Sequence, residues 1–350
     1  MKRGFIYQFK IILFICVICA SMNTDSVALG FEDLNEKAFF AKTLNPNLSC
    51  VINGSYVDMS YFESLIVNHH EWLGKKNMDL TAEEKLQAAA IARETVLFDL
   101  VKYVVLIQFA TYMDRSVDIE EVNDIYDAMA LKSALTPAQI KKVKKNIHVA
   151  ILKEKLISIY QEDVKIWDQQ VNRYYYNHKK WIDKGIKKKV LEMAFDKKEE
   201  ANMVMNRLRN GEDFSNLAYL HSTNIFHELQ QGKEGYVDLF HFPESIASNI
   251  FRMKMTDPPK MFNKGNNNYH IVKVVGEKEE GSDIDITKKV IRNYLVYERG
   301  KDRFQKQYEE LLKDTKIILN AHYFPVQEQY LPVIRDVDSP IRFVSNSIFS

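Results

Sequence analysis

Apolar residues recur at helical spacing through most of the first half of the chain. The longest stripe starts near residue 81 and continues to about residue 113 through Leu86, Ala90, Leu97, Leu100, Val101 and Val104. Similar stripes predict helices near 60–72, 120–131, 137–156 and 168–181. Short polar residues suited to capping a first turn stand at or near several starts, namely Ser60, Thr81, Thr136 and Asp168. Residues 60–184 are therefore predicted to be almost entirely helical.

Strand-like patterns flank this helical region. Two short apolar runs between residues 49 and 57 are separated by Asn53-Gly54, a pair that suits a type I′ hairpin. After residue 188 the pattern predicts a strand at 190–195, helices at 197–210, 214–220 and 246–253, and a strand at 269–275. Gly232, Gly235 and Pro243 mark a loop-rich stretch between them. This order predicts a small α+β domain, followed by a last amphipathic helix at 287–313.

The first 28 residues have the pattern of a secretory signal peptide. Lys2, Arg3 and Lys10 precede an apolar run at 11–20, and Ser26-Val27-Ala28 offers small residues for cleavage. Ten residues extend only about 15 Å as a helix, which is half of a bilayer core. We therefore expect a chain exported across the inner membrane, most simply to the periplasm, with no integral membrane segment after cleavage.

Composition and charge narrow the function classes. The 350 residues carry a net charge of +1, which offers no whole-chain electrostatic footprint for nucleic acid. Cys50 is the one cysteine beyond the predicted signal peptide, so no intrachain disulfide is expected. Histidines at 69, 70, 221, 227 and 241 lack metal-ligand spacing, so no metal site is predicted.

The order of these segments resembles that of the SurA/PrsA-type extracytoplasmic chaperones. In the helical part the resemblance rests on the turn at 51–57, on LIQFA at 106–110 and on LTPAQI at 135–140. Residues 188–276 resemble a parvulin-type peptidyl-prolyl isomerase domain, most clearly at 201–218, 221–224 and 269–274. The helix after residue 286 resembles the C-terminal helix that rejoins the N-terminal domain in that family.

The resemblance also shows departures at the expected active site. Glu192 stands where parvulins usually carry a first histidine, so His270 alone remains of the pair. Asn224 takes the position of an acidic residue or cysteine, and Glu234 takes that of an apolar pocket residue. The resemblance therefore implies a degenerate parvulin site.

Prolyl isomerisation needs an apolar pocket with polar groups at its rim, and neither a nucleophile nor a cofactor. The rim and catalytic candidates are His270, Glu192 and Asn224, and a hydrogen bond between Glu192 and His270 is expected. The substrate-binding candidates are apolar or aromatic: Phe242, Ile246, Ile250, Phe251, Met253 and Tyr269. A carboxylate at position 192 would repel substrate carbonyl oxygens, so weak or no activity is expected. The alternative is that these residues fill or edge a small domain.

Together these observations predict an α+β protein with a SurA-like helical core and an inserted parvulin-like domain. The predicted boundaries are a signal peptide at 1–28, a helical domain at 29–184, the parvulin-like domain at 185–280, a C-terminal helix at 281–320 and a tail at 321–350. The resemblance implies a chaperone for unfolded or translocating polypeptides, outer-membrane proteins among them, without nucleic-acid partners or cofactors. Two alternatives stay open: an active peptidyl-prolyl isomerase, and a surface-exposed interaction protein on the same scaffold.

Overall fold

The computed structural model describes residues 48–74, 82–129, 135–224, 226–227, 230–265, 268–315 and 317–319. The predicted signal peptide, the start of the predicted helical domain, Thr81 and the predicted tail lie outside these residues. By backbone contacts the chain forms two compact units. Residues 117–303 belong to the first, whereas 48–116 and 304–319 belong to the second, so the helix α12 (Ile284–Lys313) contributes to both. The predicted domain boundaries stay a prediction.

The second unit contains the predicted hairpin. Strands β1 (Leu48–Ile52) and β2 (Ser55–Asp58) pair antiparallel around Asn53 and Gly54, both of which have positive φ. A third strand, β7 (Ile317–Leu319), pairs with the other edge of β1. Helices α3 (Met59–Gly74) and α4 (Ala82–Tyr112) pack against this sheet. The turn is therefore confirmed, and the sheet receives its last strand from the far end of the chain.

The C-terminal half of α12 packs against α4 in this unit. Phe109 and Phe304 stack with ring centroids 6.1 Å apart, and the Tyr308 hydroxyl donates a hydrogen bond to the carbonyl oxygen of Lys102. The predicted return of the last helix to the N-terminal helices is thereby confirmed. The segment Thr95–Tyr112 of α4 has the length and hydropathy of a membrane-spanning helix, but 56% of it is buried inside the protein. That burial is typical of a core helix.

The first unit begins with three helices, α5 (Ile119–Ala128), α6 (Pro137–Gln161) and α7 (Asp168–Ile182). Thr136 caps α6 with Pro137 at its start, as predicted. Two cap predictions are wrong by one or two residues. Asp58 accepts the hydrogen bond from the Ser60 backbone N–H, so Ser60 lies within the first turn of α3. Asp168 likewise is the first helical residue of α7, and Trp167 precedes it.

A four-stranded antiparallel sheet with the order β4-β3-β6-β5 follows. Its central strands are β3 (Ile186–Phe195) and β6 (Tyr269–Glu279), and its edges are β4 (Lys233–Val237) and β5 (Lys260–Asn263). The glycines at 232 and 235 predict a loop where β4 lies, and no apolar alternation predicts β5. Both edge strands are short and half exposed, so neither shows the alternation that marks a strand buried on one face.

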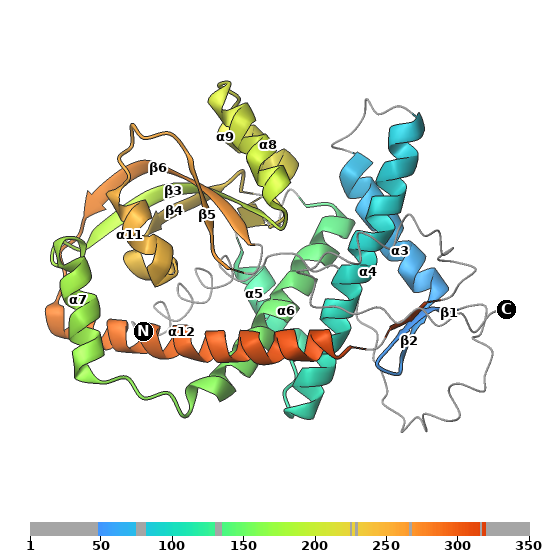
Figure 1. The fold of residues 1–350 in the computed structure, drawn as a ribbon, viewed down its shortest axis with the longest axis horizontal. Coiled ribbons are helices and arrows are strands. Elements are labelled where there is room, and N and C mark those ends of the chain that lie inside the picture. The colour runs from blue at the N-terminus through green and yellow to red at the C-terminus, as the bar shows by residue number, and fades with distance from the viewer. Residues whose placement is uncertain are drawn as a thin grey trace. The chain divides into compact units, whose positions relative to one another are not determined.

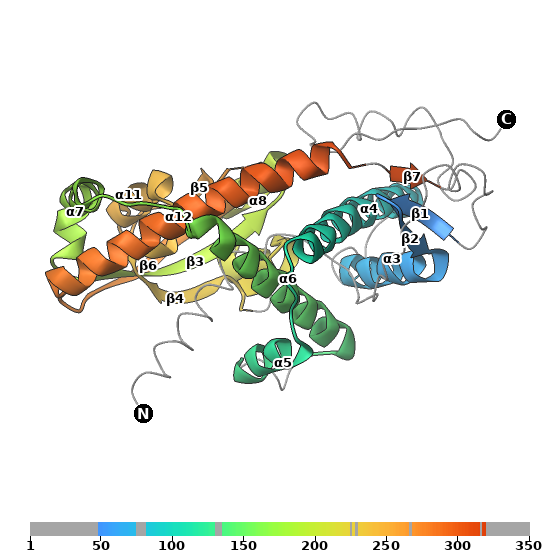
Figure 2. The ribbon, with the colours of Figure 1, turned by 90° about the horizontal axis from the view of Figure 1, so that it is seen from below.

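Helices cover both faces of this sheet (Figure 1). On one face α8 (Lys198–Arg209) and α9 (Phe214–His221) pack on Met193, Phe195 and Ile271. On the other face, α11 (Glu244–Arg252), the short 3-10 helix η2 (Leu239–His241), α7 and the start of α12 share a core with strand residues including Val190, Val272 and Val274. Figures 1 and 2 both show α12 starting beside α7, where the rings of Tyr174 and Tyr294 lie 5.5 Å apart.

Candidate functional site

The candidate site lies on the sheet face that carries α11 and η2. Side chains alternate between faces along a strand, and Glu192 shares the parity of Val190 on β3. His270 shares the parity of Val272 on β6. In the register Glu192 pairs with Val272 and Ala194 pairs with His270, so the two side chains are diagonal neighbours on one face. The two residues are 78 positions apart in sequence, and β-sheet pairing alone brings them together.

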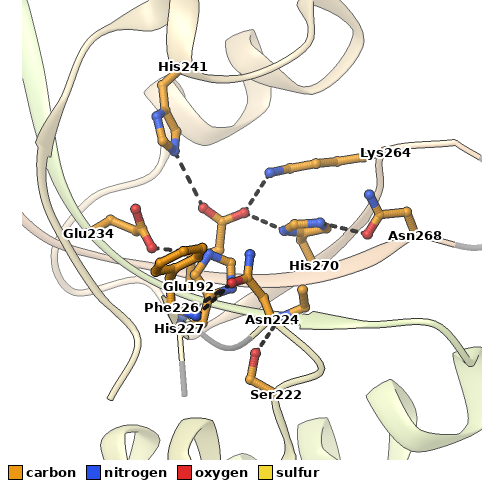
Figure 3. Close-up of polar contacts among 11 residues, drawn as sticks. Glu192, Ser222, Asn224, Phe226, His227, Glu234, His241, Lys264, Asn268 and His270 are labelled. Carbon is orange, nitrogen blue, oxygen red and sulfur yellow. Dashed lines mark hydrogen bonds and ion pairs between the residues drawn. The ribbon is translucent and has the colours of Figure 1, made fainter. Parts of the chain in front are cut away.

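The Glu192 carboxylate is surrounded by three nitrogen-bearing side chains (Figure 3). Its Oε1 accepts hydrogen bonds from Nζ of Lys264 at 2.6 Å and from Nδ1 of His270. Its Oε2 lies 3.6 Å from Nε2 of His241. The second ring nitrogen of His270 lies 2.8 Å from the Asn268 side-chain amide. We refer to Glu192, Lys264, His241 and His270 as the Glu192 cluster.

The charges in this cluster are set by burial and by Lys264. Burial alone would raise the pKa of Glu192, but the Lys264 ammonium, with help from the histidines, holds the pKa of this carboxyl well below its usual range. For His270, burial and the nearby Lys264 charge outweigh the attraction of Glu192 and lower the pKa to about 3. Near neutral pH the cluster therefore holds an ionised Glu192 beside a neutral His270, with Lys264 supplying the compensating charge.

The neutral state of His270 fixes its hydrogen bonds. Nδ1 faces the Glu192 carboxylate, and Nε2 faces the side-chain oxygen of Asn268 at 2.8 Å. Both partners are acceptors and a neutral ring carries one proton, so the ring can donate to only one of them, of which the Glu192 carboxylate is the stronger acceptor. Neither ring nitrogen of His270 is left to bind a carbonyl oxygen of an incoming peptide.

A second buried pair lies beside the cluster. Nε2 of His227 is 3.0 Å from a carboxylate oxygen of Glu234, and the His227 ring meets the His270 ring edge-on at 6.1 Å. Asn224, the third catalytic candidate, is buried, and its side-chain oxygen accepts hydrogen bonds from the backbone N–H groups of Phe226 (2.9 Å) and His227 (3.4 Å). Asn224 therefore shapes the backbone next to the site.

The site is closed. Relative exposures are 1% for Glu192, 2% for Asn224 and His270, and 6% for His241. The side chain of Lys264 is 5% exposed. A peptide therefore cannot reach the carboxylate or the imidazole until Lys264 or the surrounding loops move.

The predicted apolar pocket residues form a packed core. Five of them, Phe242, Ile246, Ile250, Phe251 and Met253, are at most 6% exposed and belong to the core beneath α11. The Lys264 ammonium lies 5.4 Å from the centroid of the Phe242 ring. Tyr269 packs against the core of α8 and α9 on the opposite face of the sheet. The structure thus places five of the six candidates on the Glu192 side and Tyr269 on the other.

Comparisons with known proteins identify the domain that carries the candidate site. Residues 186–276 match the family model described as "Rotamase: PPIC-type PPIASE domain". The foldase protein PrsA of Caldanaerobacter subterraneus subsp. tengcongensis is 28% identical over 255 residues, covering 71% of this chain and 74% of that protein. The chaperone SurA of Legionella pneumophila (strain Paris) is 24% identical over 279 residues, covering 73% of this chain and 63% of that protein. The chain is a PrsA/SurA-like protein with a PPIC-type parvulin domain.

The similarity has a limited extent. This PrsA/SurA-like chain spans less than two thirds of the SurA sequence that it matches. The chain also matches the periplasmic chaperone PpiD of Haemophilus ducreyi, with 26% identity over 200 residues. This match covers 54% of this chain and 30% of that protein. Among solved structures, PrsA of Bacillus anthracis is similar with 19% identity and a TM-score of 0.31, covering 61% of this chain and 94% of that one.

Four residues of the candidate site are not indicated by the sequence pattern. They come from separate segments: Lys264 and Asn268 from the loop between β5 and β6, His241 from η2, and His227 from the segment after α9. No shared motif links them to Glu192. The acid at position 192 within a predicted strand was a usable signal, because a carboxylate that a sheet buries requires a nearby cation or several donors. Among the residues that the structure describes, no group of three or more His, Cys, Asp or Glu side chains is arranged to hold a metal ion.

Proposed function

We propose that this protein is an extracytoplasmic chaperone that binds unfolded or translocating polypeptides and whose PPIC-type domain has weak or no isomerase activity. The relatives named foldase, chaperone and periplasmic chaperone support the general type. The observation that carries the proposal for the PPIC-type domain is the buried ion pair between Glu192 and Lys264. In this proposal outer-membrane proteins are among the clients, and the periplasm is the compartment.

The ion pair argues against efficient prolyl isomerisation for two physical reasons. An isomerase favours the twisted amide by binding the proline ring in an apolar pocket, and here the Lys264 ammonium lies over Phe242. An ionised Glu192 would also repel the carbonyl oxygen of the amide as it rotates. Were catalysis to occur, Glu192, His270 and Asn224 would be the rim groups, and Phe242, Ile246, Ile250, Phe251 and Met253 the apolar surface.

The chaperone proposal is tested by aggregation of an unfolded outer-membrane protein, diluted from urea with and without the purified chain at stoichiometric ratio. We expect light scattering to fall in proportion to the chain added, without nucleotide. Unchanged scattering at a twofold excess would contradict the proposal. The compartment is tested by cell fractionation and by protease treatment of intact cells, in which a periplasmic protein is protected.

An active isomerase is the second candidate, and the family match over residues 186–276 favours it. A proline-peptide isomerisation assay separates the two candidates. We expect little acceleration by the wild-type chain and no further loss in His270→Ala. The matched control is His221→Ala, which removes a partly buried histidine of α9 that contacts Arg207 outside the Glu192 cluster. Strong turnover that His270→Ala abolishes and His221→Ala retains would establish the isomerase instead.

A further inference from the structure

The helices α5 and α6 hold one side chain from the PPIC-type domain. Their facing surfaces form an apolar cluster that includes Phe226, whose exposure is 0%. The other buried members come from α5 and α6: Val122, Tyr126, Val143, Ile147 and Ala150. Phe226 is thus buried among residues that precede it by at least 76 positions and lie outside residues 186–276.

The segment that carries Phe226 also builds the site. Phe226 stands between Asn224, which accepts its backbone N–H, and His227, which pairs with Glu234. The backbone N–H of Gly232 donates to the carbonyl of His227 at 2.7 Å, and the N–H of Glu192 donates to the carbonyl of Gly232 at 2.8 Å. We call Asn224, Phe226, His227 and Gly232 the site loop.

The site loop has little freedom while Phe226 is in place. Gly232 adopts φ +76°, and a Cβ there would approach the carbonyl oxygen of Glu192 and the Phe214 ring to 3.0 Å. The loop therefore contacts β3 on one side, through Gly232, and packs on α5 and α6 on the other, through Phe226. A close-packed aromatic side chain has few alternative positions, so movement of either side must displace the other.

We propose that the pair α5–α6 is the docking surface of the site loop, with Phe226 as its anchor, so that these helices hold the PPIC-type site closed. Phe226 is a positioning residue in this arrangement, because it acts through Asn224, His227 and the backbone of Gly232. The inference deepens the function proposed above, since it assigns control of that same site to the helical part of the chain. Displacing the helices would release the loop and expose the Glu192 cluster.

The test is amide hydrogen exchange on the full exported chain, which needs neither a client nor isomerase activity. In Phe226→Ala we expect at least tenfold faster exchange at the amides of Glu192 and Gly232 on one side and of Ile147 on the other. Ile147→Ala, made from the α6 side, should accelerate the same three amides. Phe226→Leu keeps most of the apolar volume and should stay within threefold of wild type.

Val101→Ala is the matched control, because this buried residue of α4 belongs to the second unit and not to the cluster around Phe226. It should leave the three amides unchanged. Acceleration confined to the mutated side, in either Phe226→Ala or Ile147→Ala, would overturn the coupling. Should Phe226→Ala fail to fold, Ile147→Ala alone decides through the Glu192 and Gly232 amides. Failure of this test would leave the chaperone proposal standing, since aggregation suppression is measured separately.

Discussion

Removing the Lys264 charge should convert a compensated buried carboxylate into an uncompensated one. In Lys264→Ala, Glu192 keeps only its histidine neighbours, His270 and the more distant His241, at an exposure of 1%. Breaking a buried ion pair by deleting one partner typically costs about 3–5 kcal/mol. Folded domains have total stabilities of about 5–15 kcal/mol, so this single change should remove about a fifth or more of the unfolding free energy of the first unit.

The loss should also depend on pH. Without the ammonium, the histidines alone oppose the effect of burial, and we expect the pKa of Glu192 to rise above its usual value. The folded variant then binds a proton that the unfolded chain has already released, so the stability of the variant falls as pH rises above about 4.5. We therefore expect a larger difference from wild type at pH 8 than at pH 5.

Urea unfolding monitored by tryptophan fluorescence measures this effect. Trp181 is buried on α7 and meets the Phe251 ring at 6.0 Å, so its emission reports the first unit. The other two tryptophans, Trp72 of α3 and the 67% exposed Trp167, are replaced by Phe in all variants so that Trp181 alone emits. Lys260→Ala is the control, because Lys260 is an exposed lysine on β5, and its change should stay within about 0.5 kcal/mol.

A double variant separates charge from packing. Glu192→Gln/Lys264→Met removes both charges while keeping similar volumes, and replacing a buried pair by neutral groups is often neutral or stabilising. We expect the double variant to recover most of the stability that Lys264→Ala loses. A loss below about 1 kcal/mol in Lys264→Ala, or a double variant no more stable than it, would refute the reasoning.

Three further predictions concern protonation, thiol reactivity and backbone geometry. The free energy of unfolding of the first unit should rise with pH between about 3 and 6.5, because His270 is protonated there in the unfolded state and neutral in the folded state. His270→Asn should flatten this slope in urea unfolding measured at a series of pH values. Cys50 is fully buried with a pKa raised to about 12, so peptide mass spectrometry should show no labelling by a thiol reagent until the protein unfolds. Gly185 has φ +59°, and a Cβ there would lie 2.1 Å from the Gly281 carbonyl oxygen, so Gly185→Ala should lower the free energy of unfolding by more than about 2 kcal/mol. Gly211 has φ +89° with open space around it, so Gly211→Ala should cost about 1–2 kcal/mol from backbone strain alone.

Local patterns accounted for most helices and for the first hairpin. The Asn53-Gly54 turn forms because both residues tolerate positive φ, and Thr136-Pro137 starts α6 through its own side chain and ring. The amphipathic stripe of α12 required a covering surface, and the family resemblance pointed to the N-terminal helices, whereas the contact with α4 itself is seen only in the structure. Edge strands β4 and β5 were missed because half-exposed strands carry no alternation, and hydrogen bonds to a neighbouring strand define them.

The candidate site likewise combines features that follow from the sequence with features that only the fold creates. The sequence by itself determined that an acid occupies position 192 in a strand and that His270 lies in another, and the parity of strand positions allows them to share a face. Only the tertiary structure decided what neutralises that acid, because Lys264 is separated from Glu192 by 72 residues and reaches it from the loop after β5. The tertiary structure also decided that Phe226 is buried between α5 and α6. The physical reason is the sequence separation between the interacting residues. Turns, helix caps and apolar stripes depend on residues close in sequence, whereas charge compensation and core packing depend on residues that meet only after the chain has folded.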